Sequence, residues 1–110
     1  MLRAAFWVYA AFVLYLALTP MPPVRVSGWD KANHVYAFAS LGVLGLASWP
    51  TRPVRMLAVL LAYGCLIEIL QSFTPTRQAD WHDVLADSVG LLVAVVIWFS
   101  IQWLARRWPK

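Results

Sequence analysis

Charged residues and cysteines are scarce in this sequence. Lysine, arginine, aspartate and glutamate make up 13% of the 110 residues, whereas hydrophobic residues make up 62%. A soluble domain of this size needs more polar surface, and a disordered chain has a much lower apolar content. The one cysteine, Cys65, lies inside an apolar run, and a single cysteine excludes an intramolecular disulfide. The composition therefore indicates a membrane protein.

The positive net charge of +4 does not indicate a nucleic-acid partner. The basic residues form short clusters at the ends of apolar runs, which is where membrane topology places them. We therefore expect a lipid bilayer as the main partner and no nucleic acid.

Proline-bearing breaks separate four apolar runs. A bilayer core needs about 20 helical residues, and about 17 are tolerated, so the first run is short and the other three qualify. The sequence around Ala17 is a poor signal-peptidase site, and we expect the first run to be retained. We predict an all-α integral membrane protein, a four-transmembrane-helix bundle in a single domain over residues 1–110. The expected spans are residues 4–19, 32–49, 54–73 and 84–105.

The nine basic residues divide six to three between the two sides of such a bundle. By the positive-inside rule, the richer side is cytoplasmic, so both termini are expected there. The expected location is a bacterial cytoplasmic membrane. The richer side carries Arg3, Arg52, Arg55, Arg106, Arg107 and Lys110, and the other carries Arg25, Lys31 and Arg77.

All acidic residues and both histidines fall in the outer third of this map. Placing an ionised carboxylate in the hydrocarbon core costs at least about 2.5 kcal/mol of insertion free energy. A purely structural bundle would therefore not be expected to contain one. On the fourth run, Asp83 and Asp87 share a stripe with Gly90 and Ala94, and small residues at this spacing let membrane helices approach closely. The sequence therefore predicts an outward-facing polar pocket. Its members are Asp30, His34, Glu68, Gln71, Asp80, Asp83 and Asp87, whereas His82 is expected to be an interfacial loop residue.

Some of these residues also have purely structural explanations. Asp30 can cap a helix that begins near Lys31, and Asp83 can cap the fourth helix. Lys31 can be an interfacial residue whose amine reaches the surface.

Glu68 has a structural explanation as well, because a buried ion pair with Lys31 or Arg77 would fix the helix register. A lone His34 is more often structural than functional. Convergence from three helices and one loop nevertheless favours a site.

Three blocks of the sequence resemble the VanZ-like family. The resemblance implies a small integral membrane protein, and the founding member of that family is associated with teicoplanin resistance. One departure is Asp87, where the family usually has asparagine. The blocks are Asp30-Lys31-x-x-His34-x-x-x-Phe38, then Tyr63-Gly64-x-x-Ile67-Glu68-x-x-Gln71-x-Phe73-x-Pro75-x-Arg77, then Asp80-x-x-Asp83-x-x-Ala86-x-x-x-Gly90.

One hypothesis is an enzyme that acts on a lipid-linked or other envelope component. His34 would be the base, oriented by Asp30 or Asp83, and Glu68 would be the acid. No compact metal-ligand motif is present, so neither a metal nor another cofactor is predicted. Lys31 and Arg77 would hold an anionic phosphate or carboxylate. The other residues expected to contribute to binding are Gln71, Asp80 and Asp87.

Two other classes of function stay open. A binding or accessory protein would use the same pocket without turnover. A transporter or proton pathway fits less well, because the inner two thirds of the second to fourth runs are almost wholly apolar. The sequence sets neither the oligomeric state nor the choice between enzyme and binding protein.

Overall fold

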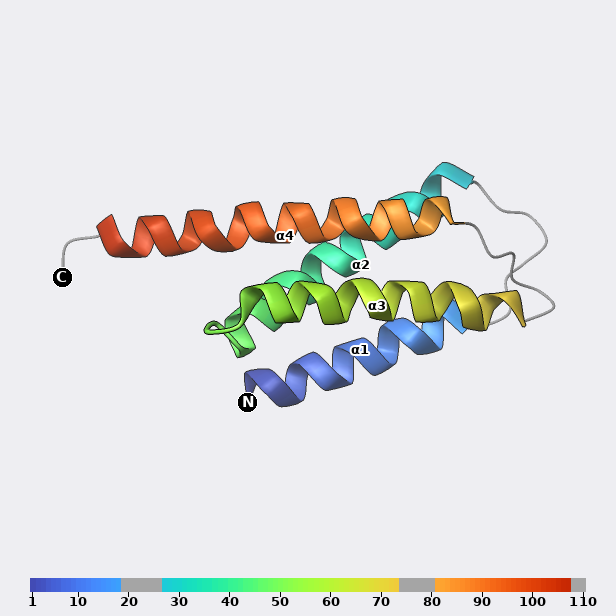
Figure 1. Ribbon diagram of the computed structural model, residues 1–110, viewed down its shortest axis with the longest axis horizontal. Coiled ribbons are helices and arrows are strands. Elements are labelled where there is room, and N and C mark those ends of the chain that lie inside the picture. The colour runs from blue at the N-terminus through green and yellow to red at the C-terminus, as the bar shows by residue number, and fades with distance from the viewer. Residues whose placement is uncertain (19–26, 74–80, 108–110) are drawn as a thin grey trace.

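The fold is entirely helical in the part of the chain that the computed structural model describes, residues 1–18, 27–73 and 81–107. This confirms the expected all-helical fold with four helices (Figure 1). In chain order they are α1 (Leu2–Leu18), α2 (Ser27–Ser48), α3 (Pro53–Ser72) and α4 (His82–Arg107).

Helix α2 begins earlier than the sequence suggests. It starts at Ser27, whereas the apolar run begins at Ala32, so the polar residues Asp30 and Lys31 belong to its first turns. An N-cap role for Asp30 is therefore wrong, because a cap residue precedes the helix it caps. The α2–α3 connection matches the proline signals: Pro53 occupies the first turn of α3, where a missing N–H costs nothing.

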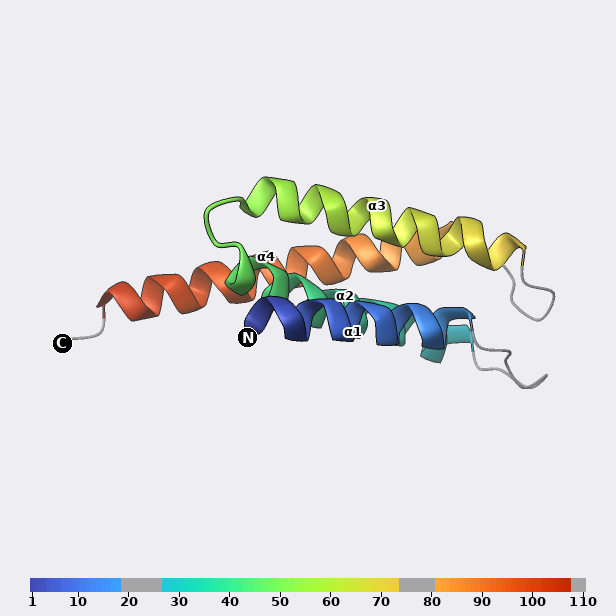
Figure 2. The same ribbon diagram turned by 90° about the horizontal axis from the view of Figure 1, so that it is seen from below.

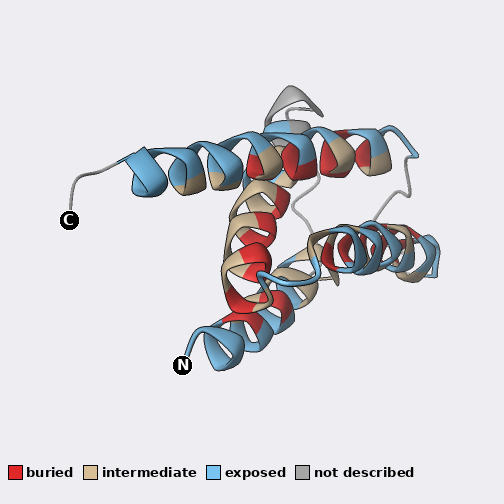
Figure 3. Ribbon diagram, turned by 60° about the vertical axis from the view of Figure 1, so that its left-hand side comes forward, coloured by how far each residue is buried: buried red, intermediate tan, exposed pale blue. Residues whose placement is uncertain are grey.

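Helix α2 makes the most extensive contact of the bundle, with α4. Helices α2 and α3 each contact the other three helices, whereas α1 and α4 do not touch within the described residues. Figures 1 and 2 show that α4 also extends well past the other helices at its C-terminal end. Figure 3 shows buried residues along α2 and on the sides of the other helices that face it, and exposed residues on the projecting part of α4.

Small residues bring α2 and α4 into close contact. A Cβ at Gly90 would lie 2.6 Å from the Val35 carbonyl oxygen and 3.0 Å from the Ala39 amide nitrogen. A Cβ at Gly42 would meet the Cβ of Ala94. The small-residue stripe of α4 thus faces α2, as its spacing predicts for packed membrane helices.

The end of the bundle that holds the α2–α3 connection is aromatic and basic. Phe6, Trp7 and Trp49 pack edge to face with ring centroids 5.2 to 6.2 Å apart. Arg3 lies over the Trp49 ring at 5.1 Å, and its Nε donates to the Ser48 carbonyl at 3.2 Å. These contacts tie the start of α1 to the end of α2.

Two helices of the described chain are long and apolar enough to cross a membrane. They are α3, with 20 residues, and α4, with 26. At 1.5 Å per residue these helices are about 30 and about 39 Å long, against a hydrocarbon core of about 30 Å. Helix α1 is apolar but shorter, with 17 residues.

Candidate functional site

Four ionisable side chains from three helices meet at the end of the bundle away from the aromatic cluster. At this end lie the N-terminal part of α2, the C-terminal part of α3 and the first turns of α4 (Figure 1). Helix α2 contributes His34, α3 contributes Glu68, and α4 contributes Asp83 and Asp87. We call these four residues the His34 cluster.

The members of the His34 cluster are withdrawn from the surface. Glu68 is 1% exposed, Asp83 3% and Asp87 0%, and the His34 side chain is 12% exposed. Charged residues are almost never this buried unless they are paired or bind a ligand. A lone carboxylate at the surface needs no special explanation, whereas the burial and convergence of these side chains do.

The closest contact in the cluster joins His34 to Asp87. The Nδ1 of His34 lies 2.8 Å from Oδ1 of Asp87. An ionised carboxylate can only accept a hydrogen bond, so with Asp87 ionised the proton of this contact is on Nδ1. In a neutral imidazole with its proton on Nδ1, Nε2 is the unprotonated nitrogen and therefore the atom that can act as a base or as a metal ligand.

Asp83 lies on the other side of the imidazole. Its Oδ2 is 3.6 Å from Nε2 of His34, which is too long for a hydrogen bond but close enough for an electrostatic interaction. Asp83 occupies the first turn of α4, one turn before Asp87. The sequence predicts Asp30 or Asp83 as the residue that orients His34, whereas the structure gives the hydrogen bond to Asp87.

Glu68 completes the cluster from α3. One ligand atom from each of His34, Glu68 and Asp83 lies within 4.8 Å of the other two. Residues 34, 68 and 83 are far apart in the sequence, so only the packing of three helices brings them together. The residues expected to carry chemistry, His34, Glu68 and Asp83, are therefore adjacent in space.

Gly64 makes room for the carboxylate of Asp87. A Cβ at Gly64 would lie 2.6 Å from Oδ2 of Asp87 and 3.4 Å from both the Asp87 Cγ and the Phe38 ring. Any side chain here would push Asp87 away from His34. In the sequence, Gly64 is singled out only as part of the second VanZ-like block. The signal that could have indicated its role is its position one turn before Glu68, on the same face of the helix.

Gln71 and Tyr63 join α3 to α1. The Nε2 of Gln71 donates to the Ala17 carbonyl at 2.8 Å, and the Tyr63 hydroxyl donates to the Ala10 carbonyl. Ala17 lies in the last turn of α1, where carbonyls have no partner within the helix. The amide nitrogen of Gln71, which the sequence predicts to be a binding group, thus has a structural role. Its buried Oε1 accepts no hydrogen bond from the residues the structure describes.

The other predicted site residues are not placed in the cluster. Asp30 and Lys31 lie on α2, about one helical turn before His34. Their side chains are not among those that the structure describes. Arg77 and Asp80 lie outside the described residues. His82 is exposed at the first position of α4.

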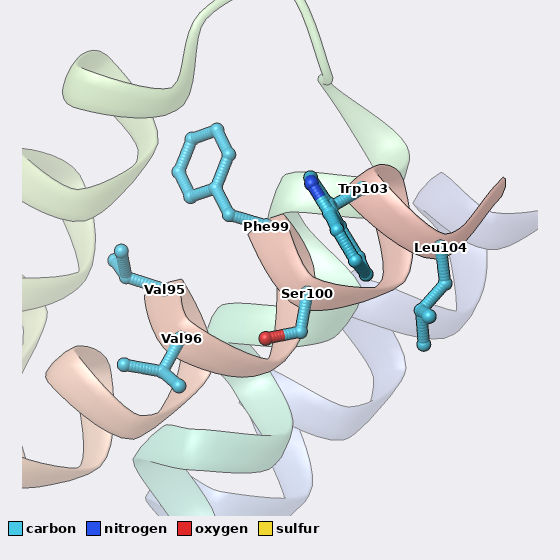
Figure 4. Close-up of a pocket in the computed structure, with 6 residues that line it drawn as sticks. All are labelled: Val95, Val96, Phe99, Ser100, Trp103 and Leu104. Carbon is cyan, nitrogen blue, oxygen red and sulfur yellow. The ribbon is translucent and has the colours of Figure 1, made fainter. Parts of the chain in front are cut away.

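A shallow hollow lies far from the His34 cluster, on the projecting half of α4. Figure 4 shows that its side chains all come from this one helix. Asp87 and Phe99 are separated by 12 residues of helix, which is about 18 Å. The hollow contains no ionisable side chain, so we do not assign it a chemical role. Its lining residues are Val95, Val96, Phe99, Ser100, Trp103 and Leu104.

Comparison with known protein families tests the resemblance to the VanZ-like family that the three sequence blocks suggest. A family model described as VanZ/LLP1 matches residues 25–104. The chain belongs to the VanZ/LLP1 family. No curated protein and no solved structure matches it. The VanZ/LLP1 match includes every residue of the His34 cluster, from α2, α3 and α4, and leaves α1 outside.

Proposed function

We propose that this VanZ/LLP1 chain is a multi-pass membrane protein whose His34 cluster binds a polar group of a cell-envelope component at the extracytoplasmic surface. The observation that carries the proposal is the convergence of three buried carboxyl side chains and one partly buried histidine from three largely apolar helices. Such residues in membrane helices mark functional sites far more often than structural ones, because burying their charge is costly.

The surface of α3 and α4 supports membrane insertion. Only 28% of the most apolar window of each helix is buried within the protein. The core helix of a soluble protein would be mostly buried, and a signal sequence would lie at the N-terminus. Large exposed side chains such as Leu66 (46%), Leu92 (63%) and Val96 (60%) instead form an apolar outer surface suited to lipid.

The distribution of basic residues supports an extracytoplasmic position for the cluster. The arginines of the described residues lie at two ends of the bundle. Arg3, Arg52 and Arg55 lie at the aromatic end, and Arg106 and Arg107 lie at the C-terminal end of α4. Both ends point the same way in Figure 1, opposite to the His34 cluster. The positive-inside rule places the arginine-rich face in the cytoplasm, so the cluster faces outward.

The ligand we propose is a headgroup that presents a phosphate or carboxylate, such as that of a lipid-linked precursor. A site near the end of a membrane bundle is within reach of a lipid headgroup, while its polar groups are shielded from bulk water. The carboxylates of the cluster would repel an anion, so we assign the anionic part of the ligand to Lys31, which precedes His34 by three residues on α2.

A second candidate function is acid–base catalysis at the same site. The hydrogen bond from His34 Nδ1 to Asp87 favours it, because a carboxylate that fixes the tautomer leaves Nε2 ready to accept a proton. Glu68 would be the acid partner. Binding alone tolerates a partial loss of the cluster, whereas catalysis through His34 does not.

Protection of a teicoplanin-sensitised cell tests the functional role of the cluster. We expect the parent chain to raise the inhibitory concentration, and we expect His34→Gln and Glu68→Gln to abolish the rise at equal membrane abundance. His82→Gln, which alters the exposed histidine of the same region, is the matched control and should protect like the parent. If all variants protect equally, the cluster is structural. If the parent does not protect, the resistance role is wrong.

A further inference from the structure

We propose that His34, Glu68 and Asp83 form a binding site for a divalent transition-metal ion, with Asp87 as the residue that orients the histidine. This inference does not rest on the proposed membrane function, because it concerns the packed helices alone. It also goes beyond the sequence, which has no compact ligand motif.

The ligand atoms are close to the spacing that a metal ion requires. One atom from each of the three residues lies within 4.8 Å of the others, and Nε2 of His34 is 3.6 Å from Oδ2 of Asp83. Ligands at the usual zinc distances in a tetrahedral site are about 3.4 Å apart. The His34–Asp83 pair is already near that value, and a rotation of the Glu68 side chain would bring the third ligand atom closer.

The His34–Asp87 contact is an independent observation that points to a metal. Histidines that bind metals almost always donate their second ring N–H to a carboxylate or carbonyl, which fixes the ring and raises its basicity. Here Nδ1 lies 2.8 Å from Oδ1 of the fully buried Asp87, which is the contact that this arrangement requires. The nitrogen that remains, Nε2, is the one that faces Asp83.

The donor set selects the class of ion. One imidazole and two carboxylates suit zinc or manganese, whereas calcium and magnesium prefer oxygen ligands alone. The negative charges of Glu68 and Asp83 would balance a divalent cation. Three protein ligands are also the number found in zinc sites that keep a fourth position for water or substrate. Such a position would suit a phosphate or carboxylate oxygen.

A metal at this site and a base at His34 are mutually exclusive, because both would use Nε2. The metal inference therefore predicts that the affinity for zinc, not merely the stability of the fold, depends on His34. Asp87 is a positioning residue in this scheme, and its substitution should weaken binding without removing a ligand.

Titration of the purified full-length chain with Zn²⁺ and, separately, Mn²⁺ tests the site. The protein is held in detergent micelles without lipid, with any histidine tag removed, and bound metal and the thermal midpoint are both measured. We expect saturable binding of about one ion per chain and a midpoint that rises with metal concentration. Failure of both ions to bind below about 100 μM would overturn the proposal.

Isosteric variants show whether the bound ion sits at these residues. His34→Gln, Glu68→Gln and Asp83→Asn should each weaken binding by about 100-fold or more, and Asp87→Asn by about 10- to 100-fold. His82→Gln is the matched control and should bind like the parent. Helical content and micelle size must match the parent, so that unfolding is not mistaken for loss of a ligand.

Two results of the variant series would overturn the assignment. One is parent-like binding by Glu68→Gln and Asp83→Asn, and the other is a loss in His82→Gln as large as that in His34→Gln. Because no membrane or envelope component is present, either result bears on the metal site alone and leaves the proposed function to its own test.

Discussion

His34 Nδ1 lies 2.8 Å from Asp87 Oδ1, a contact that joins α2 to α4 across 53 positions of the sequence. The contact fixes the orientation of the only histidine in the cluster. It also depends on Gly64 of α3, whose missing side chain leaves space for the Asp87 carboxylate. Three helices therefore determine where the imidazole points.

Replacing Asp87 should separate the hydrogen bond from the charge. Asp87→Asn keeps an acceptor of the same size, so we expect it to lower the free energy of unfolding by less than about 1 kcal/mol. Asp87→Ala removes the acceptor and should cost about 1 to 3 kcal/mol. Unfolding by SDS in mixed micelles, followed by tryptophan fluorescence, measures both. Equal losses in the two variants would show that the hydrogen bond contributes little.

Gly64→Ala should destabilise the fold through Asp87. Alanine is intrinsically favoured over glycine in a helix by up to about 1 kcal/mol, so a net loss reports the clash with the carboxylate. We expect a loss of about 1 to 3 kcal/mol in the parent. In an Asp87→Ala background the same substitution should cost at least about 1 kcal/mol less, because the clashing atoms are gone.

The control for this pair is Ala62→Val, a change of size at an exposed position of α3. It should shift the free energy of unfolding by no more than about 0.5 kcal/mol in either background. If Gly64→Ala costs the same with and without the Asp87 carboxylate, the glycine is needed for some other contact.

Glycines at the helix contacts should differ in their tolerance of a methyl group. Gly90→Ala would place its Cβ 2.6 Å from a backbone carbonyl of α2, whereas Gly45→Ala would meet the end of the flexible Met56 side chain at 2.6 Å. Backbone cannot move aside as a methionine can, so Gly90→Ala should be the more destabilising, by about 1 to 3 kcal/mol. Val89→Ala, at a half-exposed neighbour, is the control. The reverse ranking in the SDS titration would contradict the α2–α4 contact.

Tyr63→Phe should weaken the attachment of α1. It removes only the hydroxyl that donates to the Ala10 carbonyl, and interhelical hydrogen bonds of this kind contribute about 0.6 to 1.7 kcal/mol in membranes. Tyr36→Phe is the matched control, because Tyr36 is 72% exposed. The SDS titration should detect a loss in the first variant and none in the second. Equal effects would argue that the Tyr63 hydroxyl does not hold α1.

Much of the fold could be predicted from the sequence, because its signals are local. Proline breaks and apolar runs correctly predicted four helices, and the spacing of Gly90 and Ala94 correctly predicted the packed face of α4. The start of α2 could not be found in this way. Its first turns are polar, with Asp30 and Lys31, so hydropathy alone could not distinguish them from a loop.

The candidate site was predictable in composition but not in geometry. Placing the acidic residues and histidines at one end requires only helix direction, and this grouped His34, Glu68, Asp83 and Asp87. The partner of His34 depends on the rotation of α4 about its own axis. Asp83 and Asp87 lie one turn apart on the same stripe, so spacing could not decide between them. A metal site whose ligands come from three different helices likewise has no short ligand motif that could be recognised in the sequence.

The central claim is that the His34 cluster lies at the extracytoplasmic end of a membrane-spanning bundle. Single cysteines at Thr51, between α2 and α3, and at Gln78, between α3 and α4, test it directly in a chain whose Cys65 is replaced by alanine. A membrane-impermeant maleimide applied to intact cells should label position 78, and it should label position 51 only after the cells are permeabilised. Labelling of both positions from the same side, or of position 51 alone in intact cells, would contradict the account.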